Sequence, residues 1–186
     1  MKTYLMPAIK LTIIFLVITA VIYPLTIAAI GKLTPGKGDG VTVQYKGRTV
    51  GYANIGQKFT KDEYFWSRPS AVDYNAAGSG GSNKGTNNPD YLAEVKTRID
   101  TFLLKNPTVK RSEVPSDLVT ASGSGIDPNI SVEGAKVQVD RIAKTRNIEK
   151  EKVLAVIEKT KQEPLLGCLG TEKINVLALN IALDEF

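Results

Sequence analysis

The residue types in this chain exclude several kinds of catalysis. No histidine occurs among its 186 residues, which rules out a nucleophile activated by histidine and a histidine-liganded metal site. Cys168 is the single cysteine, so neither an internal disulfide nor a cysteine-rich zinc site can form. We interpret Cys168 as a small buried hydrophobic residue. We therefore expect no metal site and no catalytic residue in this chain.

A segment rich in glycine and asparagine, residues 67–89, has the composition of a ligand-binding loop. Backbone N–H groups in such a loop can bind an anion such as phosphate. A nucleotide-binding P-loop, however, ends in Gly-Lys followed by Ser or Thr. At that spacing from Gly78 the chain has Asn83-Lys84-Gly85 instead. The sequence therefore predicts no P-loop, and a polar surface turn is the simpler interpretation.

A second segment rich in small residues, residues 120–129, contains Asp127. A catalytic carboxylate needs a second acid or base nearby, and the sequence offers none, so an Asx turn is the alternative interpretation. Both segments join predicted ordered elements, and long loops inside compact domains are usually functional or disordered. We expect residues 75–89 and 120–129 to lie near each other, as a partner contact or an internal network around Asp127 and Asn83.

The first 31 residues predict a membrane anchor. Residues 11–30 carry no charge, and a helix of that length spans about 30 Å, the thickness of a bilayer's hydrocarbon core. A cleaved signal peptide is the alternative, although signal-peptide cores have only about 7–15 apolar residues. Residues 32–40 then predict a linker, and residues 41–186 a single globular domain.

The charges around the span favour a cytoplasmic N-terminus by a small margin. Lys2, Lys10 and the α-amino group precede the span, whereas Lys32 and Lys37 follow it, and positive charge marks the cytoplasmic side. The domain would then be extracytoplasmic. The whole chain has 24 basic and 19 acidic residues, for a net charge of +5. This mild balance, without basic runs between aromatic residues, argues against nucleic acid as a partner.

Polar side chains recur along the predicted span. Thr12, Thr19 and Thr26 are separated by seven residues, and Tyr23 follows Thr19 by four, so the four lie on one stripe of an α-helix. Small polar residues on one face of a membrane helix commonly pack against another helix. The alternative is that each hydroxyl bonds to its own backbone. Pro24 predicts a kink in the last third of the span.

The rest of the chain predicts a mixed α+β domain. Alternating residues over 41–45 and 48–55, with Lys46-Gly47 between them, predict a β-hairpin. Residues 61–66 predict a short helical or irregular piece with buried aromatic side chains. After the long Gly/Ser loop, apolar periodicity and capping residues predict about four helices, over residues 88–106, 131–147, 149–161 and 175–183. Arg141 and Arg146, near a helix end, suit the helix dipole.

A series of short motifs resembles one known family. The motifs are Arg68–Ala71, Tyr74-Asn75, Ser79–Asn83, Asn88-Pro89, Val114-Pro115, Leu118–Asp127, Gln138, Arg141–Arg146 and Leu179–Asp184. Together with one membrane span, their order and spacing resemble the small C subunit of the Kdp high-affinity potassium-transporting P-type ATPases. The resemblance covers nearly the whole chain, and its two Gly/Ser segments are specific to that family.

The resemblance implies a non-catalytic subunit that crosses the cell membrane once and places its domain outside. Its partners would be a channel-like potassium-binding subunit, a P-type ATPase subunit that hydrolyses ATP, a very small fourth membrane subunit and the lipid bilayer. ATP and potassium would act in the complex rather than as cofactors of this chain. The subunit would support assembly and, as a catalytic chaperone, raise the ATP affinity of the pump subunit.

Residues in these motifs are the candidates for contact with a partner or ligand: Arg68, Pro69, Tyr74, Asn75, Ser79, Gly80, Gly81, Ser82, Asn83, Ser122, Ser124, Asp127, Gln138 and Arg141. A second class of function is a free-standing, anchored extracytoplasmic binding protein or enzyme that uses the Gly/Ser loop. The lack of histidine and of paired acids favours the pump subunit, as does the threonine stripe, because a mere anchor needs no packing face.

Overall fold

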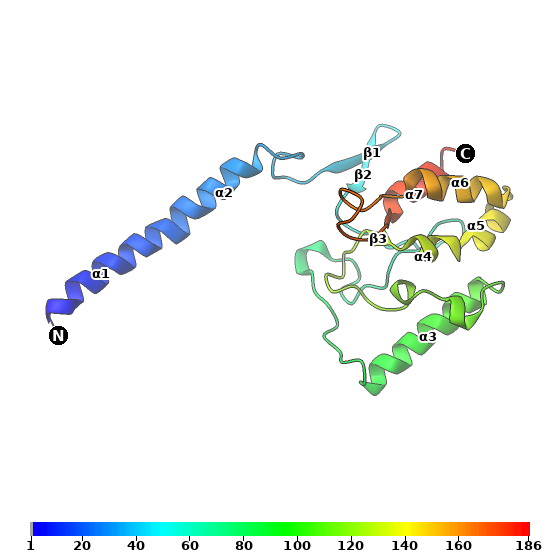
Figure 1. Ribbon diagram of the computed structural model, residues 1–186, viewed down its shortest axis with the longest axis horizontal. Coiled ribbons are helices and arrows are strands. Elements are labelled where there is room, and N and C mark those ends of the chain that lie inside the picture. Colours follow the sequence, from blue (N-terminus) through cyan, green and yellow to red (C-terminus); the bar gives the residue numbers. More distant parts are fainter. Residues whose placement is uncertain (1) are drawn as a thin grey trace. The chain divides into compact units, whose positions relative to one another are not determined.

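The computed structural model describes residues 2–186 and divides into two compact units. The first unit ends at Thr42, and the second runs from Val43 to Phe186. One long helix makes up most of the first unit, whereas the second combines helices with short strands (Figure 1). The chain is therefore a mixed α and β protein with a long apolar helix at its N-terminus.

The N-terminal helix has three parts: α1 (Lys2–Val17), a π-helical turn (Ile18–Ile22) and α2 (Tyr23–Gly31). In the π turn, the N–H of Tyr23 donates to the carbonyl of Ile18, five residues back. Tyr23 separates the turn from Pro24, which has no N–H and whose ring crowds the carbonyl of Ala20, four residues earlier and within the turn. The predicted kink is wrong: α1 and α2 follow nearly one line (Figure 1), because the helix accommodates Pro24 by a π turn.

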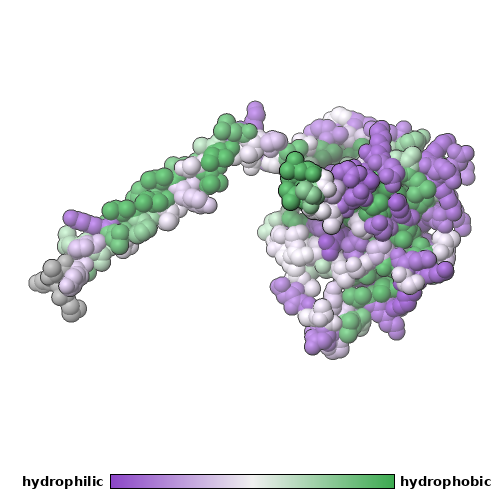
Figure 2. Space-filling view, viewed as in Figure 1, coloured by the Kyte–Doolittle hydropathy of each residue, from purple (hydrophilic) through white to green (hydrophobic). Residues whose placement is uncertain are grey.

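The segment Tyr4–Gly31 is long and apolar enough to cross a membrane. Its large side chains are exposed in the structure, and its surface is predominantly apolar (Figure 2). After it, Gly36, Lys37, Gly38 and Gly40 all have positive φ angles, so the linker is a series of tight turns. The helix therefore has the properties of a single-pass anchor.

Capping side chains set the starts of three helices in the domain. Asn88 accepts from the N–H of Tyr91 at the start of α3 (Pro89–Lys105), and Ser131 accepts from Gly134 at the start of α4 (Val132–Lys136). Asn175 accepts from Ala178 and starts α7 (Val176–Leu183). These caps satisfy N–H groups that have no partner within a helix. The predicted helix starts at Asn88, Ser131 and Asn175 are confirmed.

The single helix predicted over residues 131–147 is wrong, because α4 ends at Lys136 and a separate helix, α5, runs from Val139 to Arg146. At the break, the N–H of Gln138 bonds to the carbonyl of Ala135, three residues back, over 3.0 Å. Asn147 ends α5 in the left-handed conformation, as its type predicts. The next helix, α6, covers Lys150–Thr160.

Two small sheets complete the domain. The predicted hairpin is present as β1 (Thr42–Tyr45) and β2 (Arg48–Tyr52). A second, antiparallel pair joins β3 (Asn129–Ile130) to β4 (Ile174–Asn175), with Ile130 opposite Ile174. The sequence did not predict this pair, since two-residue strands show no alternation. It fixes the end of the second Gly/Ser segment to the start of α7.

The core lies where α6 packs against α4, α5, α7 and β4. Phe65 is fully buried in the irregular segment before the long loop, as its aromatic composition predicted. The N–H of Phe65 donates to Asn180 Oδ1 over 2.8 Å, and Asn180 Nδ2 donates to the Phe65 carbonyl over 3.0 Å. The other fully or nearly fully buried apolar side chains include Ala135, Ile142, Val153, Ile157, Ile174, Leu179 and Leu183.

Three short 3₁₀ helices lie among the loops, at Ala76–Gly78, Arg111–Glu113 and Ser116–Leu118. Between α6 and β4 the chain makes a tight turn in which Leu165 and Leu169 pair as an antiparallel bridge. Cys168 lies in this turn and is exposed. The interpretation of Cys168 as a buried hydrophobic residue is therefore wrong, because its neighbours form a protruding turn and not a core strand.

Candidate functional site

The two Gly/Ser segments lie against each other, and residues 67–82 and 120–129 are called here the loop junction. The backbone N–H of Gly80 donates to the carbonyl of Ser124 over 2.9 Å. The Ser79 hydroxyl donates to the same oxygen over 2.9 Å. The predicted proximity of the two segments is confirmed.

Hydroxyl groups hold the loop junction from inside. Ser70 Oγ donates to the carbonyl of Gly125 over 2.6 Å and accepts from the N–H of Tyr74 over 2.9 Å. The Tyr74 hydroxyl donates to the carbonyl of Arg68, and burial raises the pKa of this phenol. Ser122 is buried, and its Oγ accepts from the N–H of Gly125 over 2.9 Å. Tyr74 and Ser122 thus stabilise the junction itself.

Close backbone approach explains one glycine of the junction. Gly125 has a φ of +70°, and a Cβ there would lie 2.5 Å from Val72 Cγ2 and 2.7 Å from the Gly80 carbonyl oxygen. A Cβ on Gly81 would lie 3.0 Å from the carbonyl oxygen of Gly123, whereas one on Gly123 would meet nothing within 4 Å. Gly125 is therefore required by packing, while Gly123 borders open space.

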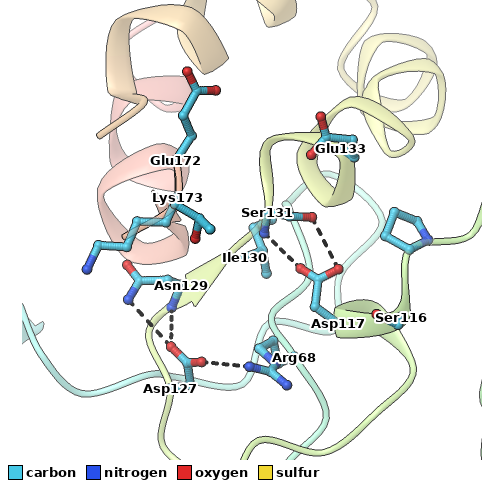
Figure 3. Close-up of a pocket in the computed structure, with 12 residues that line it drawn as sticks. Arg68, Ser116, Asp117, Asp127, Asn129, Ile130, Ser131, Glu133, Glu172 and Lys173 are labelled. Carbon is cyan, nitrogen blue, oxygen red and sulfur yellow. Dashed lines mark hydrogen bonds and ion pairs between the residues drawn. The ribbon is translucent and has the colours of Figure 1, made fainter. Parts of the chain in front are cut away.

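An ion pair closes one side of the junction, beside a cavity of about 560 Å³ (Figure 3). Arg68 Nη1 lies 2.9 Å from Asp127 Oδ2. The other oxygen, Asp127 Oδ1, accepts from the N–H of Asn129 over 3.0 Å, which is the Asx turn predicted as the alternative role of Asp127. Arg68 Nε is buried and has no hydrogen-bond partner within residues 2–186. Both members of the ion pair are about three-quarters buried.

The second carboxylate at this cavity is also engaged. Asp117 Oδ2 accepts from the N–H of Ser131 over 2.7 Å, and its Oδ1 accepts from the Ser131 hydroxyl over 3.2 Å (Figure 3). Glu133, Glu172 and Lys173 complete the charged lining. Among residues 2–186, no cluster of three or more acidic or cysteine side chains could hold a metal ion. The cavity is lined by both positive and negative side chains. Of its two aspartates, Asp127 orders its own loop, and Asp117 holds Ser131 at the start of α4.

The expected internal network contains Asp127 but not Asn83, so the prediction for Asn83 is wrong. Asn83 is exposed and has a φ of +53°, and the partner of Asp127 is Arg68. Between the short helix Ala76–Gly78 and α3, the chain runs toward the start of α3 (Figure 1).

The other candidates in and beside the loop junction differ in exposure. Pro69 is half-buried, and its carbonyl accepts from the N–H of Ser122 over 3.2 Å. Gly80 and Gly81 are also half-buried. The exposed candidates, which present a surface to solvent, are Asn75, Ser79, Ser82, Asn83 and Ser124.

Gln138 and Arg141 are not surface contacts, which corrects the expectation for both. Gln138 is completely buried and Arg141 is 6% exposed. Gln138 Oε1 accepts from the N–H of Trp66 over 2.8 Å and from Arg141 Nη2 over 2.7 Å. Their polar groups are thus satisfied within the domain, which is what burial of such groups requires.

Arg141 connects α5 to the chain before the long loop. Its Nη1 donates to the carbonyls of Tyr64, over 3.0 Å, and of Asp62, and its Nε donates to Asn106 Oδ1 over 3.1 Å. The guanidinium also lies 4.4 Å from the centre of the Trp66 ring. Burial lowers the pKa of Arg141 to about 10, so it stays charged at neutral pH. The sequence analysis explained Arg141 only by its position near a helix end, where it suits the helix dipole, and did not predict this long-range role.

Arg146 has a comparable role at the C-terminal end of the chain. Its Nη2 lies 2.6 Å from Asp184 Oδ1, and its Nε donates to the carbonyl of Glu63 over 2.8 Å. The hydroxyl of Tyr64 donates to the other oxygen of Asp184 over 3.0 Å. Partial burial and this hydrogen bond raise the pKa of Tyr64. No local pattern in the sequence pointed to these contacts.

Comparison with known proteins identifies the family. The family model KdpC, described as the c chain of the K⁺-transporting ATPase, matches residues 5–185. The chain belongs to the KdpC family. This membership confirms the resemblance drawn from the motifs, and the match includes both the apolar helix and the domain.

Relatives that bear the name potassium-transporting ATPase KdpC subunit match along almost their whole length. The subunit of Flavobacterium psychrophilum is 57% identical over 176 residues, which cover 95% of each chain. That of Bacteroides fragilis is 49% identical over 188 residues, covering 100% of this chain and 98% of the relative. That of Janthinobacterium sp. is 46% identical over 189 residues and covers both chains completely. A KdpC chain with one apolar helix of spanning length is a membrane-associated subunit for potassium transport.

The threonines of the KdpC anchor helix bond to their own backbone in this structure. The hydroxyls of Thr12, Thr19 and Thr26 donate to carbonyls four residues earlier, over 2.9, 2.7 and 2.8 Å. This is the alternative arrangement raised for the threonine stripe. Their satisfied hydroxyls leave the small side chains, and Tyr23, exposed along the helix. A close approach by another helix needs small side chains more than free hydroxyls.

Proposed function

We propose that this chain is a non-catalytic, single-pass subunit that an ATP-driven potassium uptake complex needs for assembly and stability. Membership of the KdpC family along residues 5–185 is the observation that supports this most strongly. In this proposal the complex also contains a channel-like potassium-binding subunit, a P-type ATPase subunit and a very small fourth membrane subunit. Potassium and ATP are bound by those partners.

The chemistry of the chain agrees with a non-catalytic role. The chain lacks histidine, so it cannot supply the base of a histidine-activated nucleophile. Asp117 and Asp127, the two aspartates at the cavity beside the loop junction, bond to other residues of the same chain. Carboxylates held in this way position loops and do not act as a free acid–base pair.

We place the N-terminus in the cytoplasm and the unit from Val43 to Phe186 outside. Lys2, Lys10 and the α-amino group precede the apolar helix, one positive charge more than Lys32 and Lys37 after it, and positive charge favours the cytoplasmic side. An effect on the ATP affinity of the pump subunit would then pass through the assembled complex, because ATP is cytoplasmic. Protease added to intact spheroplasts should digest the domain. Digestion only in inverted vesicles would reverse the orientation.

Assembly is tested by co-purification. Affinity purification of this chain from detergent-solubilised membranes should recover a P-type ATPase and a second large membrane protein. Loss of the gene for this chain should reduce potassium-stimulated ATPase activity in those membranes. If the full chain purifies alone from cells that express all the subunits, the proposal fails.

The exposed side of the loop junction is our proposed partner surface within the complex. Gly123 borders open space, so Gly123→Val should leave the thermal stability of the chain unchanged while lowering recovery of the partners. Glu151→Val, at an exposed position on α6, is the matched control. Normal recovery of the partners with Gly123→Val would exclude this part of the junction as a contact.

A further inference from the structure

An apolar turn protrudes from the domain between α6 and β4. Its three leucines, Leu165, Leu166 and Leu169, are 69%, 83% and 56% exposed, and Cys168 between them is exposed as well. In Figure 1 the turn lies beside β3, and α3 lies in another part of the domain. Exposed apolar residues gathered at one place, unlike those scattered singly, indicate an interaction site.

Backbone and charge contacts give the turn a defined shape. Leu165 and Leu169 exchange two N–H···O bonds, of 3.0 and 2.9 Å. One step further from the tip, Gln162 and Lys173 exchange another pair, of 2.9 and 3.2 Å. At the base, Lys161 contacts three acidic groups, those of Glu158, Glu163 and Glu172. The leucines therefore lie at the end of a short hydrogen-bonded ladder, and ion pairs hold its base in place.

Leu166 combines two unfavourable features. It has a φ of +56°, the left-handed region that asparagine or glycine adopts more readily than leucine. It also exposes most of its apolar side chain to water. Stability of the domain alone would favour Asn at this position, and a leucine there is consistent with a contact made outside the domain.

The size and charge of the turn indicate which partner it fits. Three leucines offer far less surface than the about 800 Å² per partner of a stable, free dimer. A small patch suffices when a membrane anchor already holds two proteins together, because the effective concentration is high. At the base, three acidic residues (Glu158, Glu163 and Glu172) lie beside two lysines, Lys161 and Lys173. The turn therefore has no excess of basic charge, which is what attracts a protein segment to an anionic lipid surface.

We propose that the turn, Leu165–Leu169, docks into an apolar pocket on a membrane-embedded subunit of the same potassium-transporting complex. This inference rests on the proposed function. The leucines fill the pocket, and the ion pairs of Lys161 with Glu163 and Glu172 hold the base of the turn in shape. The contact fixes the domain on its partner, whereas the apolar helix only holds it nearby.

Two variants of the full chain, expressed with its partner subunits, test the docking. Leu165→Ser with Leu169→Ser should lower the amount of this chain that remains on the affinity-purified pump by about tenfold, which corresponds to about 1.4 kcal/mol. Leu104→Ser is the matched control, since Leu104 is 78% exposed on α3, and it should leave recovery unchanged. Equal recovery of the double variant and the control would overturn the proposal.

Leu166→Asn separates docking from folding. The substitution relieves the left-handed leucine, so the melting temperature of the purified chain should stay the same or rise, while recovery with the pump falls. Recovery equal to wild type would contradict the docking role of Leu166. A variant that neither folds nor assembles would contradict our account of Leu166 as a residue retained at a cost to stability.

Cys168 allows the partner to be identified directly. The purified chain is labelled at Cys168 with a maleimide photo-crosslinker and reconstituted with its partner subunits. Crosslinking to a membrane subunit supports the proposal, whereas crosslinks to lipid, to a second copy of this chain or to nothing overturn it. If wild-type chain fails to reconstitute, the proposed function fails; if it reconstitutes without a crosslink at the turn, only this inference fails.

Discussion

The guanidinium of Arg68 lies 2.9 Å from the carboxylate of Asp127, and this ion pair joins two loop segments separated by 59 positions in the chain. The same carboxylate orders its own loop by accepting from the N–H of Asn129. Asp127 thus contributes to the loop junction both locally and over a long range.

Removal of this ion pair should destabilise the domain. Arg68→Ala and Asp127→Ala should each lower the free energy of unfolding by about 1–2 kcal/mol, because each leaves a partly buried partner unpaired. A double-mutant cycle, measured by urea denaturation, should give a coupling of about 0.5–1.5 kcal/mol. The exposed pair Lys58–Asp73, 2.6 Å apart, is the control and should give about 0.5 kcal/mol or less. Equal coupling in both cycles would contradict our account.

Arg141 should be among the most sensitive residues of the domain. Arg141→Ala leaves Asn106 Oδ1 and two partly buried carbonyls without this donor. It also removes one of the two hydrogen bonds to Gln138 Oε1. We therefore expect the free energy of unfolding to fall by about 3 kcal/mol or more. Arg111→Ala is the control because Arg111 is more than half exposed and pairs with Asp100 at the surface. It should cost about 0.5 kcal/mol or less. Thermal denaturation of the purified chains distinguishes the two, and similar melting temperatures would refute the structural role of Arg141.

Two glycines of the loop junction should respond in opposite ways to alanine. Gly125→Ala places a Cβ against Val72 and the Gly80 carbonyl at a positive φ, and should cost about 2 kcal/mol or more. Gly123→Ala meets open space and should be neutral or stabilise by about 0.4–1 kcal/mol, because alanine restricts the unfolded chain. Melting temperatures test both, with about 2–4 °C expected per kcal/mol. A tolerated Gly125→Ala would show that the two loops can move apart.

Acid should weaken the contact between α5 and α6. Lys150 lies 2.6 Å from Asp140, and its hydrogen bond lowers the pKa of that carboxyl from 3.8. The stabilisation is complete above the unfolded pKa and is lost as pH falls through the lower, folded pKa. Lys150→Met should therefore destabilise by about 0.5 kcal/mol at pH 6 and by less at pH 2.5. Urea denaturation at both values measures this, and a deficit that grows toward pH 2.5 would contradict the assignment.

Local patterns in the sequence predicted much of the fold. Asn88, Ser131 and Asn175 are caps whose side chains act within three residues, so their role is visible in the sequence itself. The hairpin turn at Lys46-Gly47 is equally local. The proximity of the two Gly/Ser segments was also predicted, because both are anchored at their ends to ordered elements.

The contacts that the sequence did not reveal are long-range. Gln138 and Arg141 bond to residues more than 70 positions earlier in the chain, and no short pattern encodes such a distance. Their polar character favoured a surface role, whereas the structure satisfies them in the core. The break between α4 and α5 was also missed because it accompanies a long-range contact: Gln138, at the break, bonds to the backbone of Trp66. Cys168 was predicted to be buried because its neighbours are apolar, but these neighbours form an exposed turn, so their apolar character did not indicate burial.

The π-helical turn at Ile18–Ile22 changes what the anchor helix presents to its surroundings in the membrane. A π turn holds one more residue than an α turn, so every residue beyond it is rotated by about 100° relative to an uninterrupted helix. Thr12 precedes the turn and Thr19 lies within it, whereas Thr26 follows it. The seven-residue spacing therefore does not produce one straight seam. A straight neighbouring helix that runs along Thr12 and Thr19 leaves Thr26 about a quarter turn to one side, open to a different neighbour or to lipid.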